Sequence, residues 1–452
     1  MDRRALLLAT GAIATATLAG CLGDTENPSD SDGDDSDRSD SGQANRNPPD
    51  LSGEPKANPD IPEAQLREVA RDNAAFAVDL YRELASDPHE NVFLSPYSIS
   101  VALAMTYAGA SGQTADEMEA VLHFTDGQDV HPAFAGLQHA LAERATTEDL
   151  AFGDEDPETV DAFELNVANA LWAREGIELA EAFQSLVADY YGAGVAEADF
   201  IGDPDGERER INAWIADQTE DRIDELLPPG AIDPQTVLVL TNAIYFLASW
   251  ESEFDPEVTV DDGFRTAAGD EVTVPFMRQE LRTDYAETHG ARAIELKYVG
   301  GDVSMVLILP EEGTFETFEA DLDADALFEI FDALSDHTGS LALPQFEIET
   351  EFELSTPLID LGMPTPFGDG ADFSEMFANG GAGVAIDEVY HDAFITIDEE
   401  GTEAAAATAV VMDESAPPSW GQLRFDRPFL FCIRDRPTDS VLFLGRVTDP
   451  IP

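Results

Sequence analysis

The sequence predicts an α+β fold built as one large domain. Apolar residues recur at helical spacing in the first half of the chain, and strand-like apolar runs gather in the second half. The chain has 452 residues, of which 43% are hydrophobic, and this suffices for a sizeable core. Since no linker rich in Pro, Gly or Ser interrupts residues 63–452, we expect a single domain of about 390 residues there.

The predicted helices each carry an apolar face. The first opens the domain and places Leu66, Val69 and Phe76 on one side. The last is expected to end before Pro228 and Pro229, which cannot continue a helix. The predicted helices are Pro62–Leu84, Ile99–Tyr107, Ala115–Leu122, Leu179–Tyr190 and Glu207–Asp224.

Strands are predicted where apolar residues run continuously or alternate with polar ones. Runs at Val237–Leu240 with Ala243–Leu247, and at Val303–Leu309, are typical of strands covered on both faces. Val389–Ile397 alternates apolar and polar residues, which predicts a strand with two unlike faces. The chain shows no internal repeat.

The chain is extremely acidic, with 93 Asp and Glu against 23 Lys and Arg and a net charge of −70. Residues 63–452 alone carry about −63, so the acidity belongs to the predicted domain. Self-repulsion would destabilise such a domain in dilute buffer, whereas molar salt shortens the screening length to roughly 3 Å. We interpret the protein as halophilic, the alternative being a merely acidic protein. Nucleic acid is disfavoured as a partner because phosphate binding needs basic clusters.

The first 21 residues resemble an export signal. Arg3 and Arg4 precede the uncharged stretch Ala5–Ala19, which is too short to span a bilayer comfortably. This arrangement resembles a Tat signal, and the Leu-Ala-Gly-Cys sequence ending at Cys21 resembles a lipobox, in which the cysteine is lipidated. An uncleaved signal anchor is the alternative. In both cases we expect the domain outside the cell, at the cell surface.

Residues 22–62 are expected to form a flexible acidic tether between the leader and the domain. They are rich in Ser, Asp, Gly, Asn and Pro and contain almost no large apolar residue to offset the entropy of ordering. The chain has two cysteines. With Cys21 lipidated, Cys432 lacks a partner, and its apolar strand predicts a buried structural thiol with no disulfide.

The sequence contains no recognisable catalytic motif. Gly109 to Gln113 has a glycine one position too early for a hydrolase elbow, and we interpret it as the turn before a helix capped by Thr114 and Glu117. Zinc-protease, C-x-x-C, P-loop and dinucleotide motifs do not occur. We expect no enzyme, no cofactor and no dedicated metal site, since cation binding by so many surface carboxylates would be unspecific.

A run of small residues follows the alternating strand near the C-terminus. Because alanine favours helices, a short surface helix over Glu403–Met412 is one interpretation. The other is a segment able to join a sheet, since every second position from Thr402 to Met412 places its side chain on one face. Gly401 would then supply the hinge. The hinge residues are Glu399, Glu400, Gly401, Thr402, Glu403, Ala404, Ala405, Ala406 and Ala407.

This run resembles the hinge of the inhibitory serpins, and four further blocks resemble the same family. In chain order the resemblance extends from about Pro62 to Pro452. The blocks, besides EEGTEAAAATAVVM, are FLSPYSISVALAM, YAGASGQTADEM, TNAIYFLASWESEF, and RPFLFCIRD with VLFLGRVTDP.

The resemblance implies the serpin fold, with helices around a large central mixed sheet, smaller sheets and an exposed reactive-centre loop. It also implies a suicide inhibitor whose loop is cut by a serine protease and then inserts into the central sheet. Counting seventeen residues from Glu399, as in the family, places the scissile bond between Ser415 and Ala416, or between Glu414 and Ser415 if the register slips. The small residue favours an elastase-like or subtilisin-like target over a trypsin-like one.

Two polar sites are also implied by the resemblance. Ser95, Ser98, Asn242 and His391 match the family's "shutter", a hydrogen-bonded patch where the central strands part. We interpret a lone histidine on an apolar strand as a satisfied core residue in any case.

Trp250 and Glu399 match the "breach", where loop insertion begins. The usual lysine partner of the acid is replaced by Gln345, so the ion pair is missing, which we interpret as salt adaptation. Two alternatives remain, a non-inhibitory serpin and a lipid-anchored binding protein. The protein is expected to be a monomer.

Overall fold

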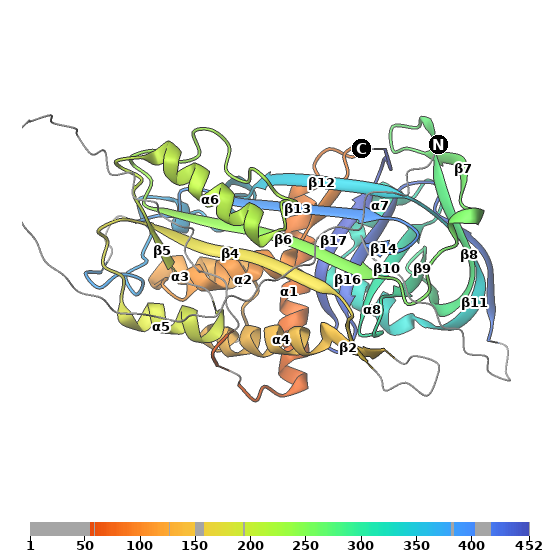
Figure 1. Ribbon diagram of the computed structural model, residues 1–452, viewed down its shortest axis with the longest axis horizontal. Coiled ribbons are helices and arrows are strands. Elements are labelled where there is room, and N and C mark those ends of the chain that lie inside the picture. Colours follow the sequence, from red (N-terminus) through yellow and green to blue (C-terminus); the bar gives the residue numbers. More distant parts are fainter. Residues whose placement is uncertain are drawn as a thin grey trace, which may run out of the picture. The chain divides into compact units, whose positions relative to one another are not determined.

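A computed structural model gives the arrangement of the chain (Figure 1). The described residues belong to one compact unit, Asn47–Pro452. They are residues 55–57, 59–125, 127–149, 158–192, 195–380, 384–402 and 417–451.

The described helices confirm the five predicted positions and add others. The helices of seven or more residues are α1 (Glu63–Leu84), α2 (Pro96–Tyr107), α3 (Gly112–Val121), α4 (Val130–Arg144), α5 (Glu181–Tyr190), α6 (Pro204–Gln218), α7 (Phe315–Asp321) and α8 (Ala324–Ala333). The shorter ones are η1 (Gly127–Asp129), η2 (Pro256–Val258), α9 (Ser355–Asp360) and η3 (Thr365–Phe367). None of the helices described is long and apolar enough to cross a bilayer.

Several helix boundaries differ from the prediction, most clearly the end of α6 and the start of α3. Helix α6 ends at Gln218, six residues early, because Glu220 and Asp221 adopt positive φ angles of 52° and 59°, which a helix cannot contain. Helix α3 begins at Gly112 rather than after a Thr114 cap. The Thr114 hydroxyl instead accepts a hydrogen bond from the Asp372 N–H, so the predicted capping box is wrong.

Most strands form two mixed sheets. The nine-stranded sheet has the order β1-β17-β16-β10-β9-β8-β11-β15, with β7 paired to β8. Its strands are β1 (Val92–Leu94), β7 (Val260–Arg265), β8 (Glu271–Thr288), β9 (Ala291–Lys297), β10 (Val303–Pro310), β11 (Ser335–Pro344), β15 (Ser419–Arg424), β16 (Phe429–Asp435) and β17 (Ser440–Val447).

The six-stranded sheet carries the candidate site and has the order β12-β13-β6-β4-β5, with β14 paired to β6. Its strands are β4 (Glu164–Arg174), β5 (Val195–Ala198), β6 (Leu238–Ser249), β12 (Phe346–Glu353), β13 (Val389–Ile397) and β14 (Gly401–Thr402). A separate pair joins β2 (Thr146–Asp149) to β3 (Glu158–Asp161). Helices around mixed sheets confirm the predicted α+β class.

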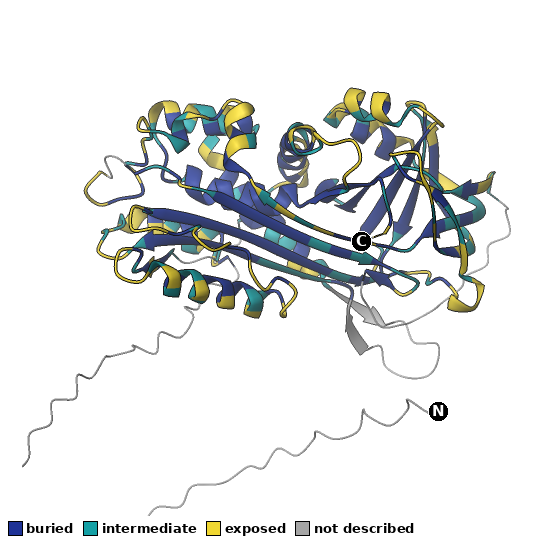
Figure 2. Ribbon diagram, turned by 90° about the horizontal axis from the view of Figure 1, so that it is seen from above, coloured by how far each residue is buried: buried dark blue, intermediate teal, exposed yellow. Residues whose placement is uncertain are grey.

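Both faces of β6, in the middle of the six-stranded sheet, are covered. Helix α6 lies over the outer face (Figure 1), where Trp214 packs edge-on against Trp172 of β4 at 5.5 Å between ring centroids. On the inner face, alternate side chains such as Ile244 and Phe246 join the main core that includes α2. Buried residues accordingly line the strands, while exposed ones follow the outer sides of the helices (Figure 2). This double burial explains the continuous apolar run of β6.

Candidate functional site

The six-stranded sheet is split at one end between β13 and β6. The two strands pair in parallel from Val389 and Leu240 as far as Ala393 and Ile244. Beyond that point β6 continues to Ser249, and its partner there is the antiparallel β14. The chain leaving β13 therefore turns back and begins to fill the place between the two strands.

Gly401 and Thr402 form β14 and belong to the predicted hinge, which begins at Glu399. Gly401 pairs with Ser249 at a φ of 153°, and a Cβ atom on it would lie 2.2 Å from the carbonyl oxygen of Ala248. Only glycine fits this close backbone approach. Thr402 is already buried, and its hydroxyl hydrogen-bonds the Tyr298 hydroxyl at 2.8 Å. The hinge has thus started to enter the sheet.

Trp250 anchors the turn between β13 and β14. Its indole stacks on Tyr298 at 4.6 Å between ring centroids and donates through Nε1 to the carbonyl of Asp398 at 3.0 Å. Its backbone N–H donates to the carbonyl of Glu400 at 3.0 Å. The sequence-predicted breach tryptophan therefore lies where the strands part.

Glu399 has two neutral hydrogen-bond donors in place of a lysine. The Gln345 amide donates to Oε2 at 2.6 Å, and the Thr259 hydroxyl donates to Oε1 at 2.5 Å. Gln345 occupies the position where the family resemblance implies a lysine. A hydrogen bond from its amide therefore takes the place of the ion pair. Such bonds persist at high salt, which screens an exposed ion pair.

The four predicted shutter residues lie together beneath the point where β13 and β6 separate. All four are fully buried. The Ser95 N–H donates to Nε2 of His391 at 3.1 Å, which leaves the proton on Nδ1 to be donated to the Asn242 carbonyl oxygen. The Asn242 amide in turn donates to the Ser98 hydroxyl at 2.6 Å. Helix α2, β6 and β13 are thereby joined by one chain of hydrogen bonds.

Asn169 of β4 belongs to this patch and was missed from the sequence. It accepts from the Ser98 hydroxyl at 3.2 Å and from the Asn242 amide, and donates to the Ser98 carbonyl at 3.1 Å. Its signal in the sequence was a single amide within the otherwise apolar residues 167–173 of β4. Burial lowers the pKa of His391 to about 3, so the imidazole is neutral and the patch is a network of uncharged groups.

The remaining predicted site residues lie partly outside the described chain. The rest of the hinge, Glu403–Ala407, the candidate scissile residues Glu414, Ser415 and Ala416, and the lipobox Cys21 are all outside it. Cys432 is buried in β16, as predicted, and burial raises the pKa of its thiol to about 12. The thiol is therefore unreactive.

The two mixed sheets, their surrounding helices and the short strand β14 at the open end of the smaller sheet define the fold class. The family model described as serpin (serine protease inhibitor) matches residues 71–450. The chain belongs to the serpin family, whose members are generally protease inhibitors rather than catalysts.

Two relatives and one solved structure are similar to this chain over most of their length. An uncharacterised serpin-like protein of Thermococcus kodakarensis is 36% identical over 453 residues, covering 99% of both chains. The leukocyte elastase inhibitor of Bos taurus is 34% identical over 395 residues, covering 85% of this chain and all of its own. The crystal structure of the thermophilic serpin tengpin in its native state superposes with a TM-score of 0.74 at 28% identity, covering 88% and 97%.

Proposed function

We propose that this serpin is a suicide inhibitor of serine proteases that acts outside the cell. The observation that carries the proposal is β14, a hinge already paired with β6 at the open end of the sheet. Similarity to a leukocyte elastase inhibitor supports the same activity. The segment that follows Thr402 would be the reactive-centre loop that the protease cuts.

The register of β14 predicts where the inserted residues would lie. Thr402 opposes Ala248, so continuing the antiparallel ladder places Ala404 opposite Phe246 and Ala406 opposite Ile244. On insertion these positions would face the core, which would account for their small side chains. Thr408 would then oppose Asn242, where its hydroxyl could join the shutter network. Insertion would thus break the pairing between β13 and β6, and the inserted strand would then hydrogen-bond the shutter residues through Thr408.

The chemical step belongs to the protease. Its serine Oγ attacks the carbonyl carbon of Ser415, the bond to the Ala416 nitrogen breaks, and the new amine leaves with a proton. Cleavage between Glu414 and Ser415 is the alternative register. The acyl ester ties the protease to the hinge, and insertion then drags it across the sheet and distorts its active site. The product is a covalent complex in which hydrolysis of the ester has stopped.

The test is incubation with elastase-like, subtilisin-like and trypsin-like proteases in molar KCl. We expect an adduct that survives SDS, with the summed mass of protease and cleaved inhibitor, for the first two classes. Mass spectrometry of the released C-terminal peptide identifies the bond. A protease whose catalytic serine is replaced by alanine is the control and should form no adduct. Cleavage of the loop by every protease without any adduct would indicate a non-inhibitory serpin.

The location outside the cell is part of the proposal and rests on the leader. Arg3, Arg4 and Cys21 resemble a Tat signal with a lipobox, so the protein would be lipid-anchored at the surface. Cys21→Ser should move an exported protein from the membrane fraction to the medium. Replacing both arginines by lysine should keep it inside the cell. A Cys21→Ser protein that stays in the membrane fraction would indicate an uncleaved anchor.

A further inference from the structure

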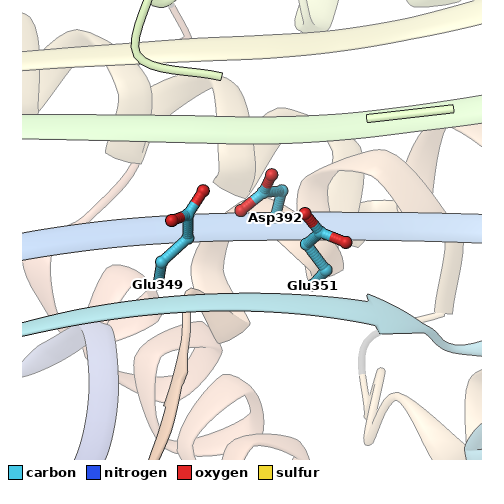
Figure 3. A group of neighbouring side chains, drawn as sticks. All are labelled: Glu349, Glu351 and Asp392. Carbon is cyan, nitrogen blue, oxygen red and sulfur yellow. The ribbon is translucent and has the colours of Figure 1, made fainter. Parts of the chain in front are cut away.

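Three carboxylates meet on the outer face of the six-stranded sheet, away from the shutter. They are Glu349 and Glu351 of β12 and Asp392 of β13 (Figure 3). One oxygen atom from each lies within 4.8 Å of the other two. The register accounts for the cluster, because Glu351 is paired directly with Asp392 and Glu349 is the next residue on the same face.

Asp392 differs from the surface acids that abound in this chain. Its residue is only 3% exposed, and its Oδ1 atom is buried without a hydrogen-bond partner among the described residues. On its other side it is paired with Ala243 of β6, which offers no polar side chain. A buried carboxylate oxygen without a donor is costly unless a proton or a cation neutralises the group. The unpartnered oxygen therefore points to a ligand.

We propose that Glu349, Glu351 and Asp392 bind a divalent cation, with Ca²⁺ preferred. Three carboxylates supply up to six hard oxygen ligands and three negative charges, which suits the large and flexible coordination shell of Ca²⁺. Mg²⁺ keeps more of its water and demands a regular octahedron, which makes three converging carboxylates less favourable. The cluster has no nitrogen or sulfur ligand for zinc. Both glutamates are exposed, so they can reorient around an ion held by Asp392.

The groups around Asp392 leave the cluster negative. On β13 the next residue on the same face is Tyr390, which donates to Glu388. On β6 the neighbouring position holds Tyr245, and the guanidinium of Arg222 lies 5.6 Å from the centre of its ring. Burial first, and then the charges of Glu351 and Glu349, raise the pKa of Asp392 to about 7. A cation must therefore compete with a proton near neutral pH.

A cation bound at this site would affect the stability of the sheet next to the shutter. Asp392 follows His391 directly, so one residue faces the shutter and the next faces the cluster on the opposite side of β13. A bound ion joins β12 to β13, one of the two strands that would border an inserted segment. It stabilises the folded protein by its preference for the preformed site over the unfolded chain.

Calorimetric titration of CaCl₂ into the full chain tests the site, at pH 7 in molar KCl so that ionic strength stays constant. We expect one Ca²⁺ per chain with a Kd on the order of 10⁻⁴ M, and at least tenfold weaker binding of Mg²⁺. Asp392→Asn should weaken Ca²⁺ binding at least tenfold. Glu351→Gln, at an exposed position that leaves the core intact, should weaken it likewise.

The matched control is Glu347→Gln, on the same exposed face of β12 but outside the cluster. It should bind Ca²⁺ like the wild type, which separates the site from screening by the acidic surface. Titration in two buffers of different ionisation enthalpy should show proton release on Ca²⁺ binding to the wild type, and none from Asp392→Asn. Equal Ca²⁺ affinity in the wild type and both cluster variants, or no binding by the wild type at 10 mM, would overturn the proposal.

Discussion

At the scale of single residues, Asn242 holds the centre of the shutter. It accepts from His391 and donates to Ser98 and Asn169. Its loss leaves the buried Nδ1–H of His391 without an acceptor and removes one hydrogen bond each from Ser98 and Asn169, which remain bonded to each other. We expect Asn242→Ala to lower the free energy of unfolding by about 2 to 4 kcal/mol. Because these bonds join β13 to β6, the variant should also insert its uncleaved loop faster on mild heating. Loss of inhibitory activity with time, measured in molar KCl, reports this step.

A buried asparagine elsewhere provides the control. Asn212 of α6 makes two hydrogen bonds of comparable quality with the backbone of Leu227, at 3.0 and 2.9 Å. Asn212→Ala should lose similar stability without accelerating loop insertion. If both variants inactivate at the same rate, the shutter is only a structural patch and its gating role is wrong.

The residues of the site were predictable to different degrees. Ser95, Ser98, Asn242 and His391 were identified by resemblance, and the structure places them in one network. Gln345 was placed opposite Glu399 by resemblance, and the structure shows the two hydrogen-bonded. Thr259 was not predictable as a second partner, because it lies far from Glu399 in sequence and only the fold brings the two together. Asp392 was assigned to the polar face of its strand, but its burial depends on neighbouring strands.

At the scale of elements, the proposed mechanism depends on β14 and on the chain that follows it. Ala404 is the first residue beyond β14 whose side chain would face the core on insertion, opposite Phe246. Ala404→Arg should convert the inhibitor into a substrate, because a guanidinium would have to enter the apolar interior at a cost of several kcal/mol. Gel electrophoresis should show cleaved inhibitor in place of the adduct. Thr402→Arg tests this less cleanly, since Thr402 is buried before cleavage.

Glu403→Arg is the matched control for that variant. Residue 403 would oppose Leu247 on the outer face and already carries a long charged side chain. The same guanidinium one position away should therefore leave most of the adduct intact. Equal trapping of protease by Ala404→Arg and the wild type would contradict insertion in this register.

Elements with a regular apolar pattern were predicted well. The bounds predicted for β13 are those observed, and the two runs predicted around Asn242 are a single strand, β6. Strand β12 was missed because four of its eight residues are glutamates, which disfavour strands by composition. Its other positions are held against the core by the fold. The 18-residue β8 was missed for a similar reason, since charged residues interrupt it.

At the scale of the whole molecule, the net charge of −70 predicts strong repulsion among the surface carboxylates. The few cations are partly used in buried pairs, such as Arg434 with Glu295 at 2.7 Å and Arg446 with Glu319 at 2.8 Å. Salt screens such buried pairs far less than it screens the repulsion among exposed carboxylates. We therefore expect a cooperative thermal transition only above about 1 M KCl. Sucrose at matched osmolality is the control and should not restore it. A melting temperature unchanged in dilute buffer would refute halophilic adaptation.

The same molecule should become more stable when its loop is cut. The pairing of β13 with β6 ends at Ala393 and Ile244, and only the two residues of β14 pair with β6 beyond that point. The remaining backbone groups along this gap could therefore pair with an inserted strand. A free hinge running from Thr402 past Thr408 would close this gap and give the continuous order β12-β13-hinge-β6-β4-β5. We expect the protein nicked by a subtilisin-like protease in molar KCl to melt at least about 10 °C above the intact protein. Nicked Ala404→Arg should show little of this rise, because its hinge is blocked. If the nicked and intact wild-type proteins melt at the same temperature, the intact fold stores no energy for trapping a protease.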